Sequence, residues 1–198
     1  MSSPLRIALY GGSFDPPHQC HVLVATWALC RGGVDEVWIT PALGHAFGKR
    51  MAPFETRCRM VAAAVAHLGP HVRVEPIEGR LPVPSYTVDT VRALLAEHPD
   101  QDVEVTLVMG ADAYAERERW KAWGELEALV GGRILVVGRG VQVGNGARNE
   151  TFALPDLSST EIRRRVAAHE PFWWMVPAPV LATIEQEGLY QVPPEVAP

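Results

Sequence analysis

The strongest constraint on the fold is a short apolar run that leads through a glycine-rich turn into a helix. Residues 5–9 are mostly aliphatic, and Tyr-Gly-Gly-Ser-Phe-Asp-Pro-Pro-His-Gln-Cys-His follows them at positions 10–21. Gly11 and Gly12 let the backbone turn tightly and bring its amides close to a ligand. The helix predicted from about Gln19 to Arg31 directs the positive end of its dipole at this turn. The segment therefore predicts a strand, a turn and a helix that together bind an anion such as phosphate.

Short apolar or β-branched runs alternate with helical segments along the chain. The predicted strands are Leu5–Tyr10, Glu36–Thr40, Val72–Pro76, Val103–Met109 and Arg133–Val137. The predicted helices are Gln19–Arg31, Pro53–Leu68, Thr87–His98 and Trp123–Val130. This alternation is typical of an α/β fold, here a Rossmann-like doubly wound parallel sheet with helices on both faces. Such a sheet binds its ligand at the carboxyl ends of the strands, where the strand order reverses.

The length of 198 residues and the hydrophobic content of 47% predict one domain that covers residues 1–198. Its core is expected over about residues 5–155, and a small C-terminal helical part that binds phosphate is expected over about residues 156–190. Val141–Asn149 is rich in Gly and Asn, which predicts an exposed loop or hairpin, and a short strand is expected near Thr151–Leu154.

Charge and cysteine content limit the partners and the compartment that we expect for this protein. The chain has 18 Lys and Arg against 23 Asp and Glu, so we expect no nucleic-acid partner. Cys20, Cys30 and Cys58 have no framework spacing and are expected to be free thiols in a reducing compartment. No apolar run approaches the roughly 20 residues that span a bilayer, so we expect a cytoplasmic protein without a membrane partner. Whether the chain forms a homo-oligomer is left open.

A second segment, Ser158-Ser159-Thr160-Glu161-Ile162-Arg163-Arg164, also carries chemistry. Hydroxyls at a helix start can cap free amides, and Ser or Thr with Glu three residues later fits a capping box. Alternatively, three hydroxyls and an arginine one turn later can converge on a phosphate group.

His18 and His21 are three residues apart, so both can face one phosphate from the same side of the helix. With Cys20 between them, a zinc site is the alternative, but no further ligands with matching spacing are evident and no metal site is expected. A thiol at a helix start beside two histidines is expected to be reactive.

The first segment resembles the nucleotidyltransferase superfamily with the His-x-Gly-His signature, and within it the nicotinate-nucleotide adenylyltransferases. The match covers Gly11, Gly12, Ser13, Phe14, Asp15, Pro16, Pro17, His18 and His21. Cys20 stands where that family usually has glycine. The second segment resembles the family's Ile-Ser-Ser-Thr-x-Ile-Arg motif, with Leu157 in place of the first isoleucine.

The resemblance implies an enzyme of NAD biosynthesis that transfers the AMP moiety of ATP to nicotinate mononucleotide, giving deamido-NAD and pyrophosphate. Mg²⁺ would bind with the ATP phosphates and need no dedicated protein cage. The implied catalytic residues are His18, His21, Lys49 and Arg163. The implied ATP-binding residues are Gly11, Gly12, Ser13, Phe14, His18, His21, Gly110, Asp112, Ser158, Ser159, Thr160 and Arg163.

The implied mononucleotide-binding residues are Ser13, Lys49, Ser85, Tyr86, Thr87 and Trp120. Arg50 is the alternative to Lys49 as a phosphate contact. In the family, amides at a helix start meet the nicotinate carboxylate and a tryptophan stacks on the pyridine ring, which fits Ser85–Thr87 and Trp120. Trp123, by contrast, is expected to be a core residue.

Two other functions stay open at this point. The acceptor could be nicotinamide mononucleotide or another phosphorylated compound such as phosphopantetheine. The chain could also be a nucleotide-binding regulator without turnover, which only Cys20 favours.

Overall fold

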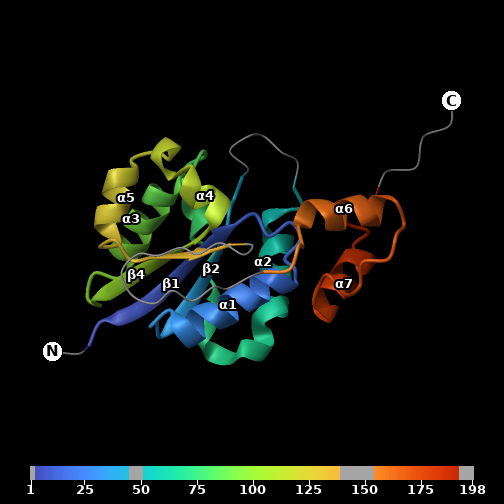
Figure 1. Cartoon of the computed structure of the whole chain (residues 1–198), viewed down its shortest axis with the longest axis horizontal. Coiled ribbons are helices and arrows are strands. Elements are labelled where there is room, and N and C mark those ends of the chain that lie inside the picture. The colour runs from blue at the N-terminus through green and yellow to red at the C-terminus, as the bar shows by residue number, and fades with distance from the viewer. Residues whose placement is uncertain (1–2, 45–50, 139–153, 192–198) are drawn as a thin grey trace.

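The computed structural model describes residues 3–44, 51–138 and 154–191. At its centre lies a five-stranded sheet in the order β3-β2-β1-β4-β5, and all four strand pairs are parallel (Figure 1). The strands are β1 (Leu5–Gly12), β2 (Glu36–Pro41), β3 (Val72–Val74), β4 (Val103–Gly110) and β5 (Ile134–Val137). The predicted α/β fold with a doubly wound parallel sheet is therefore confirmed.

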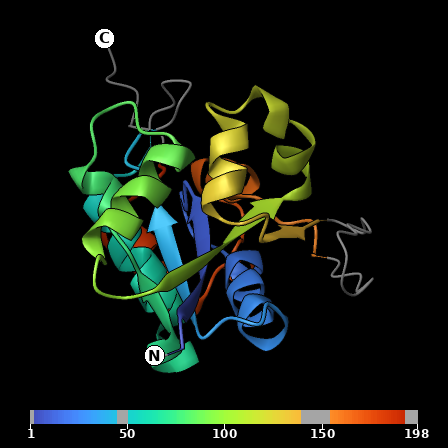
Figure 2. The same cartoon turned by 90° about the vertical axis from the view of Figure 1, so that its left-hand side faces the viewer.

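Alternate residues of the central strands face two separate hydrophobic cores. In β1, Ala8 and Tyr10 belong to one core, whereas Ile7 and Leu9 belong to the other. Both faces of the strand are buried at residues 7–10, which explains why these residues form a continuous apolar run in the sequence. Figures 1 and 2 show the sheet in the middle of the molecule with helices on both sides.

Each core is closed by its own set of helices. Buried residues of α1, α2, α6 and α7 pack on one face of the sheet, and buried residues of α3 and α5 pack on the other. The helices are α1 (Gln19–Arg31), α2 (Phe54–Val65), α3 (Thr87–Glu97), α4 (Ala111–Ala115), α5 (Trp123–Leu129), α6 (Ser159–Ala167) and α7 (Ala178–Gln186). Three 3₁₀ segments, η1 (Ala66–His71), η2 (Ile77–Arg80) and η3 (Arg117–Arg119), complete the described chain.

Several element boundaries differ from the sequence prediction. β3 ends at Val74, and the following residues turn into η2 instead of extending the strand to Pro76. α2 ends at Val65, and η1 carries the chain through Gly69 at φ 76 and then Pro70. The short helix α4 was not predicted. The expected loop at 141–149 lies outside the described residues, as does most of the expected strand near 151–154.

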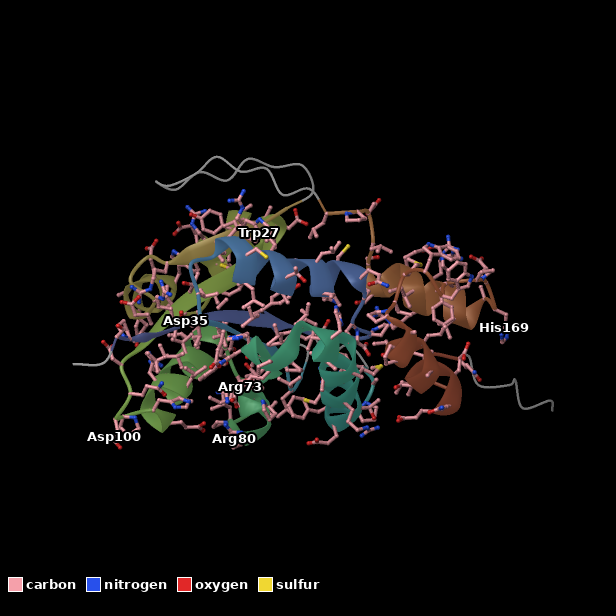
Figure 3. All side chains as sticks on the ribbon, turned by 90° about the horizontal axis from the view of Figure 1, so that it is seen from below. Trp27, Asp35, Arg73, Arg80, Asp100 and His169 are labelled. Atoms are coloured by element: carbon pink, nitrogen blue, oxygen red, sulfur yellow. The ribbon has the colours of Figure 1, made fainter. Side chains whose placement is uncertain are left out.

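The amino-terminal edge of the sheet is held by an ion pair between Arg6 and Asp35, whose Nη2 and Oδ1 atoms are 2.6 Å apart. Hydrogen bonds from Arg6 lower the pKa of Asp35 to about 2. Asp35 lies far from His169, which follows α6 at the opposite end of the molecule (Figure 3). The helices α6 and α7 therefore stand at the end of the molecule opposite this ion pair.

Strand order fixes where a ligand site can form. From β1 the chain moves outward to β2 and β3, whereas β4 lies on the other side of β1 and leads to β5. The loops that leave β1 and β4 thus diverge at the carboxyl edge of the sheet, which is where doubly wound sheets bind ligands. Within the described residues, no helix has the length and apolar character needed to cross a membrane.

Candidate active site

The turn after β1 is made by Phe14 and not by the two glycines. Gly11 and Gly12 still belong to β1 and pair with Thr40 and Pro41 of β2. Phe14 adopts a left-handed backbone at φ 48 and is 1% exposed. A Cβ on Gly12 would lie 3.1 Å from Cζ of Phe14, so Gly12 leaves room for this ring. The prediction that the glycines form the turn is wrong, because pairing with β2 keeps both of them extended.

The two histidines lie together at the start of α1. His18 precedes the first helical residue as the N-cap, and its backbone N–H donates to Nδ1 of His21 over 3.0 Å. The rings stack with their centroids 3.7 Å apart and their planes at 25°. Pro16 and Pro17 therefore precede the helix, which begins at Gln19 as predicted.

The hydrogen bond from His18 also fixes the proton on His21. Because Nδ1 accepts, the neutral ring carries its proton on Nε2 and can donate it to a ligand. Burial and the neighbouring His18 lower the pKa of His21 well below 6.5. His21 is thus a neutral hydrogen-bond donor, oriented by the backbone of His18 and by the Phe14 ring, whose centroid lies 4.9 Å from that of His21.

Asp15 is a buried carboxylate at the centre of the site, with 1% exposure. Its Oδ1 accepts from the Tyr190 hydroxyl at 2.8 Å and from the Ala52 amide at 3.0 Å. Its Oδ2 lies 3.6 Å from Nη1 of Arg163. One side chain therefore joins the β1–α1 turn to three segments that are distant in the sequence.

Arg57 of α2 holds the same turn from the other side. Its guanidinium donates to the carbonyls of Ser13 at 2.8 Å, Ala52 at 3.0 Å and Leu43 at 3.2 Å. The side chain is 1% exposed, and burial lowers its pKa. Arg57 is therefore a structural cation that fixes the backbone around the site.

The hydroxyl segment at the start of α6 lies directly against the turn. Ser158 caps α6 by accepting from the Glu161 amide at 3.2 Å, and the Ser159 hydroxyl donates to the Pro16 carbonyl at 2.9 Å. Arg163 donates to the Asp15 carbonyl and, over 3.2 Å, to the Thr160 hydroxyl. The cap reading is correct for Ser158, and the same segment also brings Arg163 beside the predicted phosphate site.

Cys20 does not have the environment that was expected for it. It is 4% exposed, and its thiol donates to the Pro155 carbonyl at 3.5 Å. A thiol buried in this way is not accessible to a reagent at the opening of the site. The expectation of a reactive Cys20 at the opening of the site is not supported by this geometry.

Four of the predicted mononucleotide residues, Ser85, Tyr86, Thr87 and Trp120, lie on the α3 and α5 side of the sheet. Tyr86 is the N-cap of α3, and Nζ of Lys121 lies 4.4 Å from the centroid of its ring. Trp120 meets the ring of Trp123 edge to face, with 6.2 Å between centroids. Trp123 is 8% exposed and packs in the core, as predicted.

The hydroxyl of Ser85 forms a hydrogen bond within the protein. It donates to Glu78, which also accepts from Thr90 of α3. Glu78 is 9% exposed, so these hydroxyls compensate for its burial and fix the chain that enters α3. Of the three predicted residues at this position, Tyr86 and Thr87 therefore supply the backbone amides at the start of α3.

The remaining predicted residues fall at the expected edge or outside the described chain. Gly110 ends β4, and Asp112 lies exposed in the first turn of α4. Lys49 and its alternative Arg50 lie outside the described residues. In the part of the chain that the structure describes, no group of three or more His, Cys, Asp and Glu side chains could hold a metal ion.

Sequence reasoning did not assign Tyr190 or Glu78 to the site. Both residues contact partners that are not their neighbours in the sequence. Tyr190, for example, contacts Asp15, which is 175 positions away. For Glu78, the nearby hydroxyls of Ser85 and Thr90 were an available signal, because a buried carboxylate needs donors.

Comparisons with known proteins identify relatives that match most of the chain. A family model described as cytidylyltransferase-like matches residues 9–165. A protein of Anaeromyxobacter dehalogenans named "Probable nicotinate-nucleotide adenylyltransferase" is 44% identical over 202 residues, covering 96% of this chain and 100% of the relative. A protein of the same name from Myxococcus xanthus is 36% identical over 191 residues, covering 96% and 97%.

Solved structures share the fold at lower identity. The nicotinic acid mononucleotide adenylyltransferase of Plasmodium falciparum, solved in complex with NaAD, superposes with a TM-score of 0.74 at 18% identity and covers 93% of this chain and 97% of its own. A putative nicotinate-nucleotide adenylyltransferase from Vibrio parahaemolyticus gives a TM-score of 0.70 at 20% identity and covers 95% and 96%. The chain therefore belongs to the cytidylyltransferase-like family and, within it, to the nicotinate-nucleotide adenylyltransferases.

Proposed function

We propose that this protein transfers the AMP moiety of ATP to nicotinate mononucleotide, releasing deamido-NAD and pyrophosphate. The observation that carries the proposal is the stacked pair of His18 and His21 at the start of α1, in contact with the turn that the α6 segment also touches. The names of the relatives support the same activity.

His21 acts as a fixed donor in this proposal. The phosphate of the mononucleotide attacks the α-phosphorus of ATP, the bond to the bridging oxygen of the β-phosphate breaks, and pyrophosphate leaves. The nucleophile is already anionic, so the reaction needs no general base and no covalent intermediate. Donors that are already oriented at the phosphate stabilise the charge that develops in the transition state. His21 fits this role because His18 holds its Nδ1 and leaves Nε2–H for the ligand.

The outer phosphates are assigned to the start of α6. Thr160 and Arg163 lie beside the turn that carries the histidines, and the helix dipole favours an anion there. Mg²⁺ bound with the triphosphate would neutralise part of its charge there. A metal ion held by substrate phosphates needs no cluster of protein carboxylates, so the described residues are compatible with it.

The mononucleotide is assigned to the cluster at α3 and α5. The amides of Tyr86 and Thr87 open α3, and such donors suit the nicotinate carboxylate. Trp120 supplies an aromatic plane for the pyridine ring. The roles of Ser13, Gly110, Asp112 and Lys49 follow the family resemblance and stay predictions.

The experiment is to measure deamido-NAD and pyrophosphate formed by the wild type and by His21→Ala. We expect the substitution to lower kcat by about 10²–10³, the usual cost of one transition-state donor, with a much smaller change in ATP affinity. His67→Ala, at an exposed position in η1, is the matched control and should keep the wild-type rate. Near-normal turnover of His21→Ala would remove His21 from the mechanism.

A further inference from the structure

Asp15, which is buried, and Tyr190, which is half-buried, form a contact that takes no part in the proposed reaction. The Tyr190 hydroxyl donates to Asp15 Oδ1 at 2.8 Å, and the Ala52 amide donates to the same oxygen at 3.0 Å. Two donors fix the plane of a carboxylate that is 1% exposed. The position of this negative charge is therefore set by the C-terminal end of the described chain.

The other oxygen of Asp15 faces Arg163. Among the described residues, Oδ2 is buried and has no hydrogen-bond partner, and Nη1 of Arg163 lies 3.6 Å from it. Nη1 itself donates to the backbone carbonyl of Asp15, and Nη2 donates to Thr160. The carboxylate thus attracts the guanidinium by charge and leaves its remaining N–H groups available to a ligand.

Tyr190 takes an unusual backbone conformation to make this contact. Gly188 and Tyr190, which follow α7, have φ values of 59° and 64°, in the left-handed region. Tyrosine rarely adopts this conformation, and it persists only where the surrounding contacts favour it. Burial and Asp15 raise the pKa of Tyr190, which keeps the phenol protonated and able to donate.

We propose that Asp15 is a positioning residue that directs Arg163 at the outer phosphates of the nucleotide, and that the Tyr190 hydroxyl holds Asp15 in place for this task. The inference rests on the proposed function, because it assigns ATP to this site. Neither residue touches the nucleotide in this account, since both act through Arg163. Figure 1 shows that α7, which leads to Tyr190, lies beside α6, which carries Arg163.

The test compares binding of Mg²⁺-ATP and of AMP by calorimetry in the wild type and in variants of these residues. Tyr190→Phe removes one hydroxyl and keeps the ring, and Asp15→Asn removes the charge and keeps the shape. We expect Tyr190→Phe to weaken ATP binding by about tenfold, the order of one hydrogen bond to a charged group, and Asp15→Asn by at least as much. AMP lacks the outer phosphates, so its affinity should change by less than about twofold.

The decisive arm is the double variant. Tyr190→Phe added to Arg163→Ala should weaken ATP binding no further, because its effect passes through the guanidinium. Thr183→Val, which removes a hydroxyl that donates to the Pro179 carbonyl within α7, is the control for general loosening of this helix and should bind ATP normally.

Equal losses for ATP and AMP, additive losses in the double variant, or unchanged ATP binding in Tyr190→Phe would each overturn the inference. Because binding is measured without a mononucleotide, an enzyme that binds ATP but fails to form deamido-NAD would contradict the proposed function alone. A wild type that does not bind ATP would contradict both.

Discussion

Replacing Arg57 by leucine should destabilise the protein strongly, because its buried guanidinium serves three backbone carbonyls. The guanidinium nitrogens lie 2.8, 3.0 and 3.2 Å from the carbonyl oxygens of Ser13, Ala52 and Leu43, and all three distances fall in the normal range for hydrogen bonds. Leucine fills part of the volume but leaves these acceptors without a donor. An acceptor left buried and unsatisfied costs about 1–3 kcal/mol.

Two effects make the total destabilisation smaller than the sum of the costs of three unsatisfied acceptors. Burial lowers the pKa of Arg57, so part of the gain from its hydrogen bonds already offsets the cost of desolvating the charge. Local relaxation will also bring water to some of the carbonyls. We therefore expect Arg57→Leu to lower the free energy of unfolding by about 3–5 kcal/mol, which corresponds to a fall in Tm of about 6–20 °C for a chain of this size.

Urea unfolding of Arg57→Leu and Arg59→Leu tests this magnitude. Arg59 lies on the same helix, but its side chain is 58% exposed in an ion pair with Glu187, so its loss should cost less than about 1 kcal/mol. Arg57→Lys should fall between the two variants, because one ammonium cannot span three carbonyls. If Arg57→Leu unfolds within 1 kcal/mol of Arg59→Leu, the structural role of Arg57 is refuted.

Three further outcomes follow from the site. The folded-state pKa of His21 lies below 6.5, so the unfolded chain takes up a proton on this residue before the folded protein does. The free energy of unfolding should therefore fall as the pH drops below 6.5, by at most about 1.4 kcal/mol per pH unit. In urea titrations, His21→Gln should make this pH dependence weaker. Trp120→Ala should lower activity equally with the acid and the amide mononucleotide, because stacking depends on the pyridine ring and not on its substituent. Steady-state kinetics with both mononucleotides tests this, and an unequal loss of activity would contradict it. In mass spectrometry after brief treatment with a thiol reagent, exposed Cys30 should be labelled before buried Cys20, and the reverse order would contradict the packing of α1.

The fold was largely predictable because its strands are buried on both faces. Runs such as residues 7–10 are then continuously apolar, and this signal does not depend on distant parts of the chain. Boundaries were harder to predict. α4 has only five residues, too short for a clear hydrophobic period, and β1 extends through Gly11 and Gly12 because β2 pairs with them.

The site was predictable where its residues are neighbours in sequence. His18 and His21 share one helix start, and Ser158 to Arg163 share another. The supports of the site could not be predicted in the same way. The contact between Asp15 and Tyr190 is decided by how α7 packs near the turn, and the burial of Cys20 by where the chain around Pro155 passes. No local pattern encodes either arrangement.

In the proposed reaction, the protein adenylylates a mononucleotide that carries a carboxylate on its ring. The most direct measurement is kcat/KM for nicotinate and nicotinamide mononucleotide, each with saturating Mg²⁺-ATP. The amides of Tyr86 and Thr87 at the start of α3 favour an anion. Charge-assisted bonds are worth about 1.5–3 kcal/mol, so we expect about a tenfold to hundredfold preference for the acid, with one pyrophosphate released per deamido-NAD formed. A preference for the amide, or activity with neither mononucleotide, would contradict it.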